Sequence, residues 1–205
     1  MKQQSMNITS MTTFRLLYDN IHDFKSTAMY VESEIKRHGI RNDSYDAVPG
    51  MQNRIHHDMW VSMKTVSHFN LGIALELMLK LLLSLNNIPM LHSHYLTKLH
   101  DAIPKKYQQQ LEDTYQKSKS CFPDDYKLIA FINAASSNPL SQSPPTNREI
   151  LNLRGFFEYL DEDVMLWEKR YSWELVEKKC WRHYLSDISV FVELINRVMQ
   201  GIKRD

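Results

Sequence analysis

Glycine and proline are scarce in this chain, with five glycines and seven prolines among 205 residues, roughly half the share typical of globular domains. Collagen-like, low-complexity and turn-rich all-β architectures rely on these two residues, so their scarcity disfavours all three classes and favours helices. Hydrophobic residues make up 43% and charged residues 24% of the chain. These shares are typical of a globular protein with a real core, and the length fits a single domain.

The chain also lacks a large net charge of either sign and has too few cysteines for a disulfide framework. The 25 lysines and arginines nearly balance the 24 aspartates and glutamates, giving a net charge of +1, so composition does not indicate a wholesale polyanion binder. The two cysteines, Cys121 and Cys180, form no CxxC pair. This pattern excludes a disulfide scaffold and favours free structural thiols in a reducing cytoplasm.

Membrane and export signals are weak. The most apolar segment, Phe69–Leu85, is 17 residues long and contains Asn70, Glu76 and Lys80, which are costly in hydrocarbon. The N-terminal residues MKQQSMNITSMTTF lack the apolar stretch of a signal peptide. We therefore expect a cytoplasmic protein with a buried core helix and no membrane partner.

The common catalytic motifs are absent: the chain has no P-loop, GxGxxG, HExxH or GxSxG sequence. His92, His94 and His100 lie close together, but His94 and His100 are six residues apart. Two metal ligands on one helix need a spacing of three or four residues to face the same way. The sequence therefore predicts no metal site and no cofactor.

Helical periodicity is what the sequence does contain. Apolar residues recur at spacings of three and four, and no alternating run is long enough to seed a sheet. We predict an all-α, single-domain helical bundle over residues 1–205, with long central antiparallel helices and short accessory helices. The main helices are predicted over 12–38, 53–87, 146–169 and 181–203, the accessory helices over 93–102, from 104 onward and over 124–134, and a flexible loop rich in serine and proline over 135–146.

The second half of the helix predicted over 53–87 is apolar on almost every side between Leu71 and Leu83. A helix of this kind must be covered on every side. It is therefore either the central helix of a bundle or part of a subunit interface. Glu76 and Lys80 lie four residues apart in the favourable order for an intrahelical ion pair.

One stretch carries a family resemblance. The segment Phe69–Pro104 contains a leucine-rich helix with an embedded Glu76 and Lys80, followed by a His-x-Leu-x-x-Leu segment that begins at His94. It resembles the HEPN (higher eukaryotes and prokaryotes nucleotide-binding) helical domains. The later segment Leu153–Glu174 is similar to the stretch rich in aromatic residues and arginine that some members carry.

The resemblance implies a helical bundle that usually forms a homodimer. Many HEPN members are metal-independent RNases of toxin–antitoxin, CRISPR-associated and phage-defence systems. Their signature is an arginine followed, after four to six residues, by a histidine late in the domain. The arginine would stabilise phosphate charge and the histidine would act as acid and base in attack by the RNA 2′-OH. Other members lack the motif and act as binding or antitoxin modules.

This chain departs from the signature. Arg182 and His183 are adjacent, and no histidine follows Arg170 at the required distance. The pair with the right spacing is Arg15 and His22, early in the chain, where seven helical steps place both on one face, about 10 Å apart along the axis. They are the candidate catalytic residues of an RNase hypothesis.

Three hypotheses follow. The favoured one is a HEPN-like protein that binds RNA, a nucleotide or a partner protein, in phage defence or toxin–antitoxin regulation, without catalysis. Its candidate ligand-binding residues are Glu76, Lys80, His94, Arg154 and Arg170. The second is a metal-independent endoribonuclease that uses Arg15 and His22. The third is a structural interaction protein that associates through its apolar helix.

Overall fold

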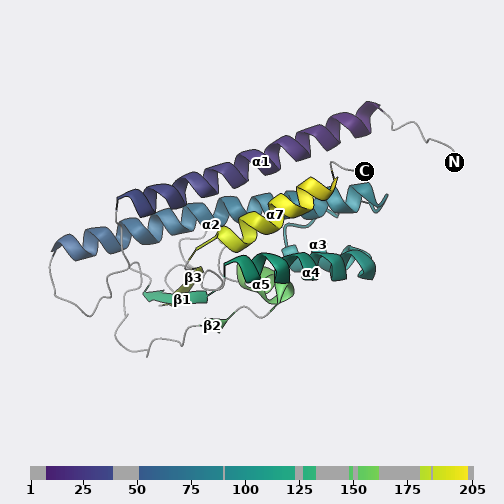
Figure 1. Cartoon of the computed structure of the whole chain (residues 1–205). Helices are drawn as coiled ribbons and strands as arrows, with labels where there is room; N and C mark the ends of the chain where they lie inside the picture. Colours follow the sequence, from purple (N-terminus) through teal and green to yellow (C-terminus); the bar gives the residue numbers. More distant parts are fainter. Residues whose placement is uncertain are drawn as a thin grey trace.

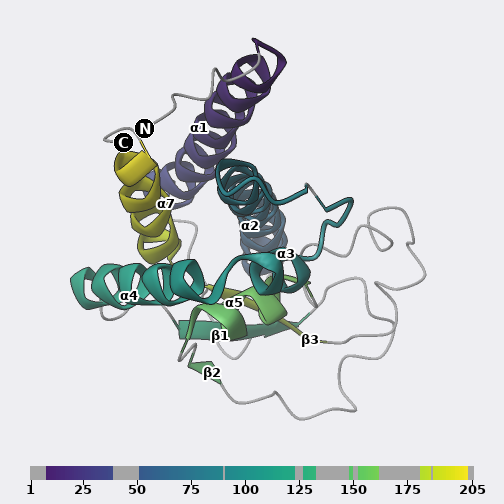
Figure 2. The same cartoon turned by 90° about the vertical axis from the view of Figure 1, so that its right-hand side faces the viewer.

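In the part of the chain that the structure describes, two long helices and four shorter ones pack together (Figures 1 and 2). The computed structural model describes residues 8–38, 51–89, 91–122, 127–132, 148–149, 152–161, 181–185 and 187–202. The predicted bundle of packed helices is confirmed. Its helices are α1 Ile8–Arg37, α2 Met51–Leu85, α3 Leu96–Ala102, α4 Lys105–Cys121, α5 Leu153–Tyr159 and α7 Ser189–Ile202.

Helices α1 and α2 run antiparallel and side by side along most of their length (Figure 1). Their bounds confirm the helices predicted over 12–38 and 53–87 to within a few residues. Ile21, Ala28 and Ile35, each seven residues apart, are buried on the inner face of α1, because two helical turns return nearly to the same side. The hairpin of α1 and α2 is therefore held by an apolar stripe.

The leucine-rich half of α2 is covered by the chain itself. Leu71, Leu75, Met78 and Leu79 are completely buried, and other helices contribute to the same core. By length and composition the stretch Ser62–Leu85 would be able to cross a membrane, but most of it is buried inside this fold. This stretch was expected to be either the central helix of a bundle or part of a subunit interface, and in the structure it is the central helix of the bundle.

Aromatic rings join α4, α5 and α7. Phe191 of α7 stacks on Phe156 of α5 and on Tyr115 of α4, with centroid distances of 3.4 and 5.7 Å. All three rings are buried. Aromatic pairs in such stacks contribute more than their burial alone, so this cluster fixes α5 against the rest of the bundle.

Three short strands were not predicted. Strands β1 Lys127–Ile132, β2 Arg148–Glu149 and β3 Trp181–Leu185 form an antiparallel sheet in the order β2-β1-β3. The expectation that no sheet forms is therefore wrong here, as are the helix over 124–134 and the helix starts at 146 and 181. Short apolar runs fit a strand or a helix equally well, and partners about 50 residues away decide the outcome.

The later helices consequently begin further along the chain than predicted. Helix α5 starts at Leu153, where the side chain of Asn152 accepts a hydrogen bond from the Gly155 amide at 2.7 Å. Helix α7 starts at Ser189, whose amide donates to Asp187 at 2.8 Å. The predicted loop 135–146 and residues 162–169 of the third predicted main helix lie outside the described residues.

A buried histidine attaches the sheet to the bundle. His68 of α2 donates from Nδ1 to the Lys64 carbonyl at 2.7 Å, and its Nε2 accepts the Leu185 amide of β3 at 3.0 Å. The two contacts define a neutral imidazole with its proton on Nδ1. Burial, together with the nearby Lys64 ammonium, lowers the pKa of His68 to about 3.

A buried ion pair joins the two long helices. Lys64 Nζ of α2 lies 2.7 Å from Glu32 Oε2 of α1, and Ser67 donates to Glu32 Oε1 at 2.9 Å. The side chains of Lys64 and Glu32 are only 2% and 7% exposed. Both carboxylate oxygens are thus satisfied away from water, which sets the register of α1 on α2.

Candidate functional site

Helix α3 is the centre of the predicted ligand-binding residues, and a buried carboxylate holds it in place. Asp161, directly after α5, accepts hydrogen bonds from the backbone amides of Leu96 and Thr97 at 2.8 and 3.0 Å. It also accepts the Thr97 hydroxyl at 2.6 Å. These amides at the start of α3 have no partner within the helix, so Asp161 supplies the cap from another part of the chain.

Replacing Asp161 with alanine is expected to lower the free energy of unfolding by about 2 kcal/mol, because two helix-start amides lose a charged acceptor. Asp161→Asn keeps one acceptor oxygen and should cost about half as much. Urea unfolding followed by circular dichroism measures both changes. The matched control is Asp113→Ala on the exposed face of α4, expected within about 0.5 kcal/mol of the parent. Equal costs for Asp161→Ala and the control would contradict this role.

The three matched positions of the family resemblance meet in space. Glu76 Oε1 accepts Lys80 Nζ at 2.6 Å and lies 3.0 Å from His94 Nδ1, although His94 is 18 residues further along the chain. The intrahelical ion pair predicted for Glu76 and Lys80 is therefore present. The His94 side chain is 50% exposed, which leaves one edge of the cluster open to solvent.

The carboxylate of Glu76 is not fully satisfied. Its side chain is only 5% exposed, and its second oxygen, Oε2, is buried without a hydrogen-bond partner. Buried carboxylate oxygens normally accept hydrogen bonds, and an unsatisfied one costs free energy. This atom can accept a donor that the described residues do not provide.

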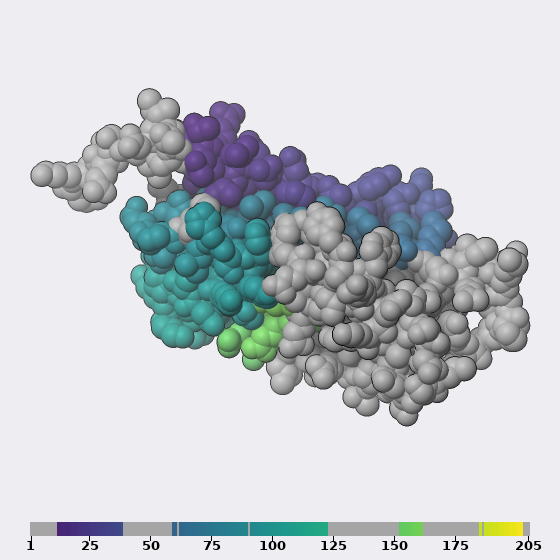
Figure 3. Space-filling model, turned by 180° about the vertical axis from the view of Figure 1, so that it is seen from behind, coloured from purple at the N-terminus to yellow at the C-terminus, as the bar shows by residue number. Residues whose placement is uncertain are grey.

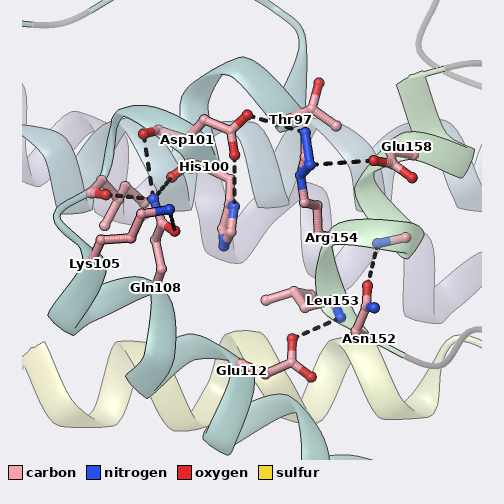
Figure 4. Close-up of polar contacts among 12 residues, drawn as sticks. Thr97, His100, Asp101, Lys105, Gln108, Glu112, Asn152, Leu153, Arg154 and Glu158 are labelled. Atoms are coloured by element: carbon pink, nitrogen blue, oxygen red, sulfur yellow. Dashed lines mark hydrogen bonds and ion pairs between the residues drawn. The ribbon is translucent and has the colours of Figure 1, made fainter.

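Arg154 lies beside the other end of α3 (Figure 4). Its guanidinium contacts Asp101 Oδ2 at 3.2 Å and Glu158 Oε1 at 3.5 Å. The side chain is 48% exposed. The second oxygen of Asp101 lies 3.6 Å from His100 Nδ1. One carboxylate thus stands between an arginine and a histidine.

His100 faces inward. Its ring packs against Phe157 with a centroid distance of 5.5 Å, and the residue is buried. Burial lowers the pKa of His100, although Asp101 opposes the shift. The imidazole is therefore held in its neutral form near neutral pH, with Nδ1 directed toward a carboxylate.

Polar side chains also fix the start of α5, which carries Arg154 (Figure 4). Glu112 of α4 accepts the Leu153 amide at 3.0 Å, and Asn152 caps the same helix. Gln108 of α4 donates to the carbonyl oxygens of His100 and Ile103 at 3.1 and 2.7 Å. Helix α4 therefore positions both α3 and α5.

The candidate catalytic pair lies elsewhere, on α1. Arg15 is exposed, and His22 is partly buried, with its ring 5.0 Å from that of Tyr18 and its Nδ1 3.4 Å from Lys25 Nζ. Neither residue contacts the α3 region in the interactions that the structure describes. Arg170, the remaining candidate, lies outside the described residues.

Basic side chains lie at both ends of α3, Lys80 at one and Arg154 at the other, so this region can bind an anionic ligand. Arg154 offers N–H donors in a planar fork that suits phosphate oxygens, and Glu76 offers an acceptor. Seen from behind, the surface of α3 and α4 adjoins that of α5 (Figure 3). Among the described residues no cluster of three or more histidine, cysteine, aspartate or glutamate side chains is placed to hold a metal ion.

Sequence reasoning missed His100, Asp101 and Asp161 as members of this region. A helical pattern gives the sides of α3 on which His100 and Asp101 lie, but it does not show that Arg154 of α5, 53 residues further along the chain, contacts Asp101. Asp161 stands in an acidic run, Asp161-Glu162-Asp163, which gives no sign that one member turns inward to cap α3. No protein-family model, curated protein or solved structure matches the chain.

Proposed function

We propose that this chain is a HEPN-like protein that acts by binding RNA or a nucleotide at the surface around α3, in a phage-defence or toxin–antitoxin setting. The observation that supports the proposal is the meeting of Glu76, Lys80 and His94, with Arg154 at the opposite end of the same short helix. Glu76, Lys80 and His94 are also the positions that carry the family resemblance in the sequence.

A ligand can displace the carboxylates that contact Arg154. Its partners, Asp101 and Glu158, are each about half exposed, and exposed ion pairs contribute little stability, about 0–1 kcal/mol each. A phosphate group can therefore replace them at small cost, and it gains two parallel hydrogen bonds from the guanidinium.

The Glu76 cluster suits the base of a nucleotide. Sequence-selective proteins read the edges of unpaired RNA bases through hydrogen bonds. The buried Oε2 of Glu76 is an acceptor without a donor, and the half-exposed imidazole of His94 lies at the open edge. A base with N–H groups on its edge, such as guanine, matches this arrangement.

Binding is favoured over catalysis because the pair with the family spacing is remote from α3. Arg15 projects from α1 into solvent, while His22 packs against Tyr18 on the same helix. The homodimer that the resemblance implies would use other surfaces than Leu71–Leu83, which the chain already covers. A partner protein is the alternative ligand.

Arg154→Ala is expected to weaken binding of a fluorescein-labelled single-stranded RNA about tenfold, or about 1.4 kcal/mol, because one phosphate contact is lost. The slope of log Kd against log salt should also fall by about 0.7. Fluorescence anisotropy at several salt concentrations measures both quantities. Lys117→Ala on exposed α4 is the charge-matched control and should leave affinity within about twofold.

Two outcomes would contradict the proposal. Equal weakening by Arg154→Ala and Lys117→Ala would mean that contact with RNA is not localised at α3. Chelator-resistant cleavage of the RNA by the parent protein, lost in His22→Ala, would instead support the RNase hypothesis.

A further inference from the structure

Lys25 is a buried cation that has no anionic partner among the residues that the structure describes. The residue is 8% exposed and lies where α1 faces α7. Its Nζ donates to Asn196 Oδ1 at 2.6 Å and lies 3.4 Å from His22 Nδ1. Neither partner is an anion, and among the described residues no carboxylate lies within ion-pair distance of this ammonium group. Burial lowers the pKa of Lys25.

Three carboxylates of α1 and of the segment from Asp187 through α7 are committed to other groups. Glu32 pairs with Lys64, and Glu193 with Arg197 at 2.7 Å. Asp187, just before α7, pairs with Lys36 and accepts from Ser189. The other buried lysine, Lys64, has a carboxylate oxygen of Glu32 2.7 Å from its Nζ. Among the described residues, Lys25 is a buried lysine without such a carboxylate.

The flank of α1 around Lys25 is basic. At 100° per residue, Arg15, Tyr18, His22 and Lys25 fall within about 80° of one another around the helix axis. Asp19 falls outside this sector, toward the outer face. Arg15 is exposed and His22 is half-buried, so the basic flank leads from solvent to the buried ammonium group.

Buried charges in proteins are paired with an opposite charge or bind one, because an isolated charge in a poorly solvated site is costly. Asn196 presents its oxygen to Lys25, and the nitrogen of the same amide carries two N–H donors. The ammonium group of Lys25 and the amide N–H donors of Asn196 are complementary to phosphate oxygens. Arg15, about 15 Å further along the helix axis, adds positive charge at the open side.

We propose that the region between α1 and α7 that is defined by His22, Lys25 and Asn196 binds a phosphate group, which supplies the missing negative charge to Lys25. The phosphate belongs to a small phosphorylated molecule or to an RNA backbone. The site is separate from the α3 surface and stands whether or not that surface binds RNA.

The test measures thermal unfolding of the full chain with increasing inorganic phosphate. A ligand that binds only the folded state raises the melting temperature in proportion to its occupancy. In the parent protein we expect a saturable rise with phosphate. In Lys25→Met, which keeps the length of the side chain without its charge, half-maximal stabilisation should need at least about tenfold more phosphate. Lys117→Met is the control and should respond as the parent does.

Asn196→Asp provides a second, independent variant. The new carboxylate would lie against Lys25 and act as an internal substitute for the phosphate. We expect this variant to melt higher than the parent without phosphate and to lose its response to phosphate. A parent-like response in both Lys25→Met and Asn196→Asp would overturn the proposal, and so would the absence of any response in the parent.

Competing ligands identify the source of the phosphate. A mononucleotide that stabilises at lower concentration than inorganic phosphate supports a small ligand, and a short single-stranded RNA that does so supports the backbone of a nucleic acid. In both cases Lys25→Met should remove the part of the effect that Arg154→Ala leaves. Arg154→Ala is expected to keep the response to inorganic phosphate, which separates this site from the one proposed around α3.

Discussion

Replacing His68 with alanine is expected to lower the free energy of unfolding by about 3 kcal/mol, a large part of the stability of a single domain. The change leaves the buried Leu185 amide of β3 without its acceptor and opens a cavity beside α2. The sheet has few other links to the bundle in the described contacts. We therefore expect β3 to lose its attachment before the long helices separate.

The same histidine should make the protein sensitive to acid. Its pKa is about 3 in the folded chain against an ordinary value of 6.5. Between these values the unfolded chain binds a proton that the folded chain excludes, so stability falls as pH falls. The expected slope from His68 alone is about 1.4 kcal/mol per pH unit. The pKa of His100 is also lowered, and it adds a contribution of the same sign.

His68→Gln separates the two roles of this side chain. The glutamine amide keeps an acceptor for the Leu185 amide but does not titrate, so the variant should show a smaller loss of stability between about pH 6.5 and 4.5. Urea unfolding at several pH values measures the slope. Asp187 does not interfere in this range: burial opposes its ionisation, but hydrogen bonds from Lys36 and Ser189 lower its pKa below 3.8. A slope unchanged by His68→Gln would contradict the assignment.

The contrast between helices and strands shows what sequence can predict here. The long helices follow from local spacing, because each apolar residue three or four positions on returns to the same side. Strand β3 depends on pairing with β1, in which Tyr184 lies opposite Ile129. Such pairing leaves no trace in the local spacing of a five-residue run. Periodicity alone therefore placed a helix where a distant partner makes a strand.

The α3 region shows the same limit for functional residues. Glu76 and Lys80 are four residues apart on one helix, so their contact follows from sequence. The family resemblance singles out His94 as a candidate residue, but its approach to the same carboxylate was not predicted. Lys25 gave no signal in sequence, because its peculiarity is that the side chain reaching it from α7 is an amide, Asn196, and not a carboxylate, which only the tertiary structure reveals.

Substitutions in the buried ion pair of Lys64 and Glu32 are also expected to change the free energy of unfolding strongly. Lys64→Met alone is expected to destabilise the protein by about 3–5 kcal/mol, since the Glu32 carboxylate stays buried with only the Ser67 hydroxyl to balance it. Glu32→Met should cost a similar amount, because the buried Lys64 ammonium group then loses its carboxylate partner. An exposed pair makes the control: Arg37→Met breaks the contact of Arg37 with Glu34 and should cost less than about 1 kcal/mol.

The double variant Lys64→Met/Glu32→Met should recover most of the loss, because the two desolvation penalties disappear together and apolar side chains suit a dry helix interface. A double-mutant cycle from urea unfolding of all four proteins gives the coupling energy, expected to be at least about 2 kcal/mol. Ser67 retains the carbonyl of Ala28 at 3.4 Å as an acceptor, so its hydroxyl does not become a new buried defect. If the single losses simply added in the double variant, each side chain would act through its own packing, and the pair would not set the register of α1 on α2.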